Sequence, residues 1–300
     1  MKKIILIFVV ISLVALATSC QKEVTLKQLP YDSKLSIECL ITPNQIPKVY
    51  LNKTLPYLTG AAFNSTFFAR NASITISSAT NTISFSPDSV YSFIQCDYIY
   101  YYIGNSTINS NTTYTLNVFF DNKNYSATCN TSQPIVSIDS VGYVKVFKDL
   151  YGEHEGVVVY YTDPSNLGQY YRYDMMRMVD SSNYKANLSS SGKSACLTNL
   201  KVEAHEIGRT IYTDQNSNGQ NSSITFEPAY KHKTDDTTYI KLQVMDKNAF
   251  DYYDQLDRQK LAQFNPFVEP SYLKPTQFKD AFGCFGAYSI SDIFLFVYPE

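Results

Sequence analysis

Residues 35–130 alternate apolar and polar side chains with a period of two, and this pattern constrains the fold more than any other feature of the sequence. Alternate side chains of a strand point to opposite faces, so each such run predicts a half-buried strand. The apolar sets are Leu35, Ile37, Cys39 and Ile41; Ala72, Ile74 and Ile76; and Tyr114, Leu116, Val118 and Phe120. Tyr 26 and Phe 18 suit strands, and runs of Ser, Thr and Asn suit the turns between them. The chain is therefore expected to be mainly β.

Turn residues divide this pattern into hairpins and two domains. Asp121 to Asn124 separate two alternating runs, which predicts a β-hairpin. Several short strands over about 100 residues indicate a sandwich of the immunoglobulin or transthyretin kind. The sequence around Pro134 breaks the alternation, so we place a domain boundary there. The expected N-terminal β-sandwich domain spans 34–132, and a C-terminal, sandwich-like β domain spans 135–300.

The second domain is expected to hold more strands and one amphipathic helix. Strand patterns cover 141–147, 156–162, 169–178, 224–227 and 239–245, and a closing strand is expected within 287–299. Near 247–264 the apolar residues recur at intervals of three and four, which predicts the helix. Asp246 can cap its start, and Pro266 follows its end. Its apolar face is expected to pack on the second sheet, and a partner-binding helix is the alternative.

The N-terminus has the pattern of a lipoprotein signal peptide. Lys2 and Lys3 precede an apolar run from 4 to 16, and small residues then lead to Cys20. A transmembrane anchor is the alternative, but the apolar run is shorter than the roughly 20 residues that a bilayer span needs. Leu16 stands four residues before Cys20, where the usual lipobox has Leu at three. We expect residues 1–20 to be the signal, Cys20 to carry palmitate and other lipid that holds the protein to a membrane, and 21–33 to form a tether.

The remaining composition excludes some roles and leaves others open. A net charge of -2, with scattered basic residues, gives no footprint for nucleic acid. Five cysteines follow Cys20, and in an oxidising compartment they allow two disulfides and one free thiol. Buried, unpaired cysteines are an equally good interpretation, and the pairing cannot be read from the sequence. These cysteines are Cys39, Cys96, Cys129, Cys196 and Cys284.

Candidate catalytic and metal-binding groups are sparse. Glu153-His154-Glu155 places two carboxylates around an imidazole, but in a strand His154 points away from both. Glu203, His205 and Glu206 form a second weak cluster, and His232 between two lysines is interpreted as a surface residue. No recognisable metal spacing, nucleophile motif, phosphate loop or dinucleotide fingerprint is present. We therefore predict no enzyme activity, no metal and no cofactor.

Two further groups of residues are candidates for contact or modification. Tyr100 and Tyr102 share one face of a predicted strand and are expected to form an exposed strip that contacts a ligand. Three short triplets resemble the acceptor pattern for O-linked glycosylation in the periplasm of Bacteroidota, at Ser89, Ser140 and Thr237. Ser89 and Thr237 are favoured, because the Ser140 triplet leads into a predicted strand.

Several segments in a consistent order resemble a lipoprotein family of the Bacteroidota known only as domain-of-unknown-function family 4249. They are Cys20-Gln21-Lys22-Glu23, Leu35 to Ile41, Ala72 to Ile76, Ile138 to Val141, Thr162-Asp163-Pro164, Tyr252-Tyr253, Asn265-Pro266-Phe267 and Phe282 to Ser289. Gln21, Lys22 and Glu23 are similar to the signal that exports such lipoproteins to the cell surface.

The resemblance implies a location and a role. It implies an outer-membrane lipoprotein that faces the cell exterior and is an accessory of a transporter energised by TonB, by analogy only. We expect such a chain to act in nutrient uptake by binding, with the ligand unknown. A structural or adhesive surface protein is the alternative, and a metal-dependent hydrolase is the third.

Overall fold

A computed structural model describes most of the chain after the N-terminal segment. It describes residues 30–55, 64–92, 97–149, 152–166, 168–180, 201–207, 211–216, 218–227, 232–264, 273–275 and 277–299. In this part of the chain the strands form two sheets, one of thirteen strands and one of three. The prediction of a mainly β, sandwich-like chain with one long helix is confirmed.

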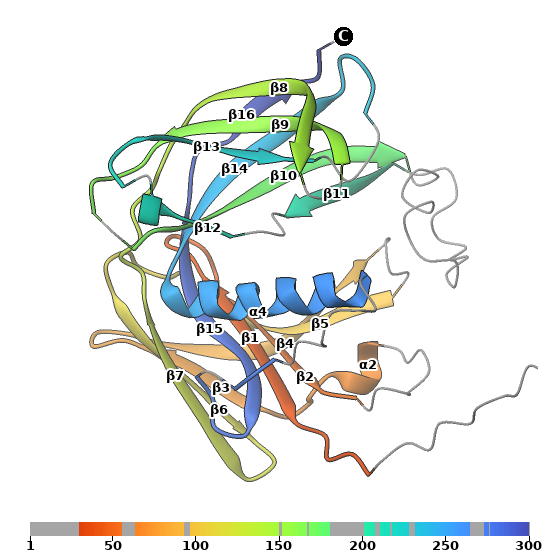
Figure 1. Cartoon of the computed structure of the whole chain (residues 1–300). Helices are drawn as coiled ribbons and strands as arrows, with labels where there is room; N and C mark the ends of the chain where they lie inside the picture. The colour runs from red at the N-terminus through yellow and green to blue at the C-terminus, as the bar shows by residue number, and fades with distance from the viewer. Residues whose placement is uncertain are drawn as a thin grey trace, which may run out of the picture.

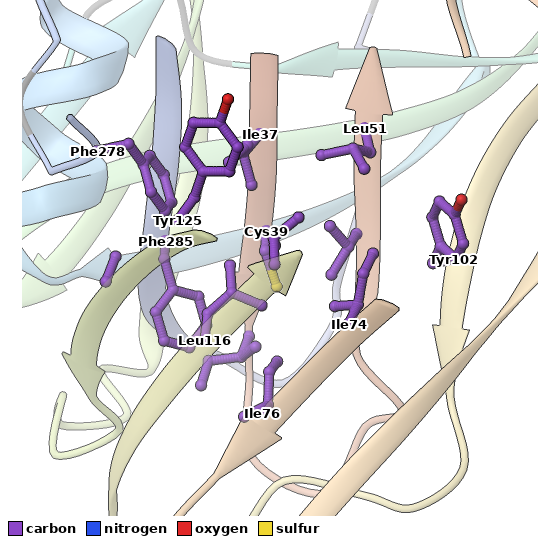
Figure 2. Packing of buried hydrophobic residues seen from close by; sticks show 14 of the residues in the cluster. Ile37, Cys39, Leu51, Ile74, Ile76, Tyr102, Leu116, Tyr125, Phe278 and Phe285 are labelled. Atoms are coloured by element: carbon purple, nitrogen blue, oxygen red, sulfur yellow. The ribbon is translucent and has the colours of Figure 1, made fainter. Parts of the chain in front are cut away.

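The first half of the molecule is built from strands that follow the period-two pattern. In chain order these are β1 (Leu35–Ile41), β2 (Lys48–Lys53), β3 (Ser73–Ser77), β4 (Thr82–Ser92), β5 (Asp97–Gly104), β6 (Thr113–Phe120) and β7 (Lys123–Asn130), with the short helix α2 (Asn64–Phe67) between β2 and β3. In β1 every second residue is buried, as the alternation predicts. Figure 2 shows Ile37 and Cys39 of β1 in the same interior as Leu51, Leu116 and Phe285.

The predicted hairpin joins β6 and β7. Phe120 and Lys123 pair across it, and Asp121 and Asn122 form the two-residue turn. Both turn residues have positive φ, 51° and 59°, which is the conformation that a type I′ turn requires. Asp and Asn tolerate this left-handed conformation better than other residues with a Cβ, so the local sequence sets the register of this hairpin.

The second half contains a small sheet facing part of the large one. β8 (Ile138–Asp149), β9 (Gly152–Thr162) and β13 (Asn221–Phe226) form the three-stranded sheet, at the top of Figure 1. The large sheet contributes β10 (Tyr170–Asp180), β11 (Lys201–Ile207), β12 (Tyr212–Thr213), β14 (Thr237–Met245) and β16 (Phe294–Val297), with the 3-10 turn η2 (Asp214–Asn216) after β12. Val157, Tyr171 and Ile240 lie in the core between the two layers.

Strand β15 (Ala281–Ile290) joins the two halves. Its first seven residues pair in parallel with β1, and Tyr288 to Ile290 pair antiparallel with β14. Figure 1 shows it running from the lower half of the molecule to the upper half. The predicted closing strand within 287–299 is thus two strands, β15 from Ala281 and the separate β16. The division expected at 132–135 remains a prediction, although β15 pairs with a strand from before it.

The long helix α4 (Lys247–Phe264) has the bounds that the sequence predicts. Asp246 caps it, because its Oδ1 accepts a hydrogen bond of 2.8 Å from the Ala249 amide. The apolar face of the helix packs on β15, which belongs to the predicted C-terminal domain and also pairs with β1. Gly286 makes this approach close, since a Cβ there would lie 2.9 Å from the Ala249 Cβ. Among the described helices, none is long and apolar enough to cross a bilayer.

Candidate functional site

A pocket of about 300 Å³ opens on the face of the large sheet that is turned away from the N-terminal core. We call it the β1–β2 pocket, and its lining residues come from β1, β2, the turn between them and β15. They are Glu38, Leu40, Thr42, Gln45, Ile46, Pro47, Lys48, Tyr50 and Tyr288. The volume is at the lower end of the range for pockets that hold small molecules.

Strand alternation explains why these side chains face the pocket. Ile37, Cys39 and Ile41 point into the core, so Glu38 and Leu40 point to the opposite face of β1. Tyr50 lies directly opposite Glu38 in the antiparallel pairing of β1 and β2. A carboxylate and an aromatic ring are therefore neighbours on the pocket floor by register alone.

Helix α4 holds the carboxylate of Glu38 from one side. The Tyr253 hydroxyl donates a hydrogen bond of 2.9 Å to Glu38 Oε1. The guanidinium of Arg172, on β10, lies 4.2 Å from the centre of the Tyr253 ring, a cation–π contact. Burial, and then the charge of Glu38, raise the pKa of Tyr253, so this hydroxyl remains a hydrogen-bond donor at neutral pH.

The opposite side of the pocket is held by β5 and β15. The Lys48 ammonium lies 4.6 Å from the centre of the Tyr101 ring, and the Tyr50 ring is 5.8 Å from the same ring. Burial raises the pKa of Tyr50 and of Tyr288, and for Tyr288 the charge of Asp174 adds to the effect. Both tyrosines thus present a protonated hydroxyl as well as an aromatic ring.

The lining of the pocket combines charged, hydrogen-bonding and aromatic groups. Its lining offers one carboxylate, one ammonium, an amide, hydroxyl groups and aromatic rings, and it includes no Ser, Cys or His. In the described part of the chain, no group of three or more His, Cys, Asp or Glu side chains is placed to hold a metal ion.

The predicted lipidation site and the predicted export signal lie outside the described residues. These are Cys20, the last residue of the predicted signal, and Gln21, Lys22 and Glu23, at the start of the predicted tether. In Figure 1 the segment that leads into β1 lies at the lower end of the molecule, and the last strand, β16, lies at the upper end.

The described cysteines are buried and unpaired. Cys39, Cys129 and Cys284 have free thiols, which agrees with the interpretation as small buried residues. Burial raises the pKa of all three thiols, so they are poor nucleophiles. Cys96 and Cys196 lie outside the described residues.

The expected exposed strip of Tyr100 and Tyr102 is wrong for Tyr102. Its side chain is 2 % exposed, and its hydroxyl donates a hydrogen bond of 2.8 Å to the Ala69 carbonyl oxygen. Tyr100 is half-buried and stacks on Phe68 at 5.5 Å between ring centres. The segment after α2 covers this face of β5, which the alternation within one strand does not reveal.

The three glycosylation candidates all lie in strands of the described structure. Ser89 is half-buried in β4, opposite Tyr100 on β5. Ser140 is exposed in β8, and Thr237 is exposed where β14 begins. Their modification remains a prediction.

The histidine clusters are arranged as separate pairs. His154 Nδ1 lies 3.2 Å from Glu227, and Glu155, on the other face of β9, lies 3.4 Å from His232 Nδ1. The surface position predicted for His232 is wrong, because its side chain is 9 % exposed and stacks on Tyr298 at 3.8 Å. Glu203, His205 and Glu206 belong to β11, for which the structure describes only the backbone.

Sequence reasoning did not find the β1–β2 pocket. Glu38 and Tyr50 look like ordinary outward residues of strands, and Tyr288 is distant in the chain. The one available signal was a carboxylate between the apolar residues Ile37 and Cys39.

A search of curated proteins finds no significant match to the chain. A family model described as a domain of unknown function, DUF4249, matches residues 22–293, so the chain belongs to the DUF4249 family.

Proposed function

We propose that this protein is a non-catalytic binding lipoprotein of the outer membrane, facing the cell exterior, and an accessory of a TonB-dependent transporter in nutrient uptake. The observation that carries the binding role is the β1–β2 pocket, where Glu38, Tyr50 and Tyr288 line one small cavity. Such a cavity, which combines charged and hydrogen-bonding groups with apolar and aromatic side chains, can hold a small molecule.

The N-terminal sequence supports the anchoring part of this proposal. An apolar run too short to span a bilayer ends in small residues and Cys20, and polar residues follow. The family resemblance supports the transporter part by analogy. A tether of 13 residues, 21–33, would leave the folded part free to lie against a membrane protein at the same surface.

The anchoring is tested by Cys20→Ser in the full chain. The wild-type protein should partition into detergent and fractionate with outer membranes, whereas the variant should be soluble or mislocalised, because the lipid is its only proposed attachment. Exposure to added protease on intact cells tests the outward orientation. Unchanged detergent partitioning of the variant would refute lipid anchoring.

The accessory role is tested by mild detergent extraction of the tagged, lipidated protein. A large outer-membrane β-barrel should co-purify, and deletion of the gene should slow uptake of a nutrient through that barrel. Recovery of the protein alone as a monodisperse monomer, with normal uptake in the deletion strain, would contradict the role.

An adhesive surface protein is the second candidate, and one observation favours it. Tyr91 and Tyr98 face each other on the β4–β5 hairpin with ring centres 5.2 Å apart, and their side chains are 36 % and 48 % exposed. Exposed aromatic side chains are common anchors of protein interfaces. An adhesin should lose cell attachment in a Tyr91→Ser, Tyr98→Ser variant without any change in nutrient uptake.

A further inference from the structure

The charged side chains of the β1–β2 pocket are turned apart by their protein partners. Glu38 is held toward α4 by the Tyr253 hydroxyl, and Lys48 is held over the Tyr101 ring on β5. The two groups lie on neighbouring strands and are diagonal in register, because Glu38 pairs with Tyr50 and not with Lys48. Each charge thus already has a protein partner, which leaves it less available to pair with the opposite charge of a zwitterionic ligand such as an α-amino acid.

The pocket also has no excess of charge that would select an ion. One carboxylate and one ammonium line it, so a ligand of either sign would meet a repulsive group as well as an attractive one. A wholly apolar ligand would take water from Glu38, Lys48 and Gln45 without replacing their hydrogen bonds, which is costly. The lining thus disfavours both extremes of ligand polarity.

The ligand class that still fits this lining is one with hydroxyl groups around its edge and apolar C–H faces. Tyr50 and Tyr288 supply rings for such faces, and Leu40 and Ile46 extend the apolar surface. Glu38 and Gln45 can accept hydrogen bonds from hydroxyl groups, and Lys48 can donate them. We infer that the β1–β2 pocket binds a small neutral sugar of one or two rings.

This inference rests on the proposed binding role but not on the membrane anchor or the transporter. It is tested with the purified, mature full-length chain in detergent. Isothermal titration calorimetry and saturation-transfer NMR measure the binding of glucose, galactose, mannose, maltose and lactose, with glycine, lysine and choline as ionic probes. At least one sugar should bind, and the ionic probes should not. If no sugar binds, or if an ionic probe binds in this pocket, the inference is wrong.

Variants locate the binding. Tyr50→Ala and Tyr288→Ala should each weaken sugar affinity about tenfold, since each removes a stacking ring. Tyr288→Phe keeps the ring and should retain most of the affinity, which separates a local effect from misfolding. Tyr160→Ala, an exposed tyrosine on β9 and outside the pocket, is the matched control and should bind as the wild type does. Equal affinity in all these variants would place the sugar elsewhere and overturn the inference.

Failure of this test is distinguishable from failure of the proposed function. A protein that binds no sugar but co-purifies with a transporter would retain the accessory role. A protein that binds sugar in vitro but shows no partner and no uptake defect would retain the pocket assignment alone.

Discussion

Asp246 offers a test of how helix α4 is attached, because its carboxylate has two opposing effects. It caps the helix through the Ala249 amide, which is stabilising, and it is packed between the helix and β15. Burial raises the pKa of Asp246 from 3.8 to about 6, although the backbone hydrogen bond from Ala249 opposes that shift. The charged form is therefore less favourable in the folded protein than in the unfolded chain.

The sign of the pH dependence follows from this shift in pKa. Between pH 3.8 and about pH 6 the folded protein binds this proton more often than the unfolded chain does, so its free energy of unfolding falls as the pH rises. The stabilising contribution is complete only well below pH 3.8 and is lost as the pH rises through about 6. From the two pKa values, the loss between pH 4 and pH 8 is about 2 kcal/mol.

The variant Asp246→Asn isolates this contribution. Asn is as good a cap as Asp, but it does not titrate. Urea denaturation of both proteins at unit intervals from pH 4 to pH 8 gives the difference in their free energies of unfolding. That difference should move in favour of the variant by about 2 kcal/mol over the range. Groups that do not interact with Asp246 titrate equally in both proteins and cancel.

A second variant separates the cap from the charge. Asp246→Ala removes both, so at pH 4 it should be less stable than Asp246→Asn by about 1 kcal/mol, the usual value of a cap. A difference between wild type and Asp246→Asn that stays constant from pH 4 to pH 8 would refute the reasoning, because it would show that Asp246 titrates alike in both states.

Three further predictions concern stability and reactivity. Gly283→Ala should lower the free energy of unfolding by about 3 kcal/mol or more, because φ of Gly283 is +121° and a Cβ there would lie 1.8 Å from the Ile37 carbonyl oxygen. Gly168→Ala, at a position that also has positive φ but has open space around it, should lower the free energy of unfolding less. Asp163→Ala should lower the free energy of unfolding by about 2 kcal/mol, since this buried carboxylate accepts a hydrogen bond from the Tyr171 hydroxyl. An unchanged urea midpoint in the variant would contradict this prediction. In a variant with Cys20, Cys96 and Cys196 replaced by Ser, the three described cysteines should react with Ellman's reagent only after the protein is unfolded. Rapid reaction in the native state would disprove their burial.

The features that the sequence predicts well are those whose cause is local. The β6–β7 hairpin depends on Asp121 and Asn122, which accept positive φ where the strands turn. Helix α4 depends on its own apolar spacing and on the cap at Asp246. In each case the deciding interactions lie within a few residues, so a single sequence is sufficient.

The features that it predicts poorly depend on distant segments. The predicted surface position of His232 relied on its flanking lysines, but Tyr298 from the end of the chain stacks on it. The face of β5 that carries Tyr102 is covered by the segment after α2, which the pattern of β5 alone does not reveal. The pairing of β15 with β1 joins segments about 240 residues apart, and neither pattern identifies the other as its partner.

The β1–β2 pocket belongs to this second class, and its assembly divides between strands and helix. Strand register alone places Tyr50 beside Glu38, while β15 must pair with β1 before Tyr288 can line the same cavity. The direction of the Glu38 carboxylate is set separately, by Tyr253 on a helix 215 residues further along the chain. Loss of the Tyr253 hydroxyl should therefore reorient one hydrogen-bonding group and leave the aromatic walls in place. Under the proposed binding role, the walls would provide the apolar contact area and the helix would orient the polar group, so ligand affinity and ligand selectivity would depend on different parts of the fold.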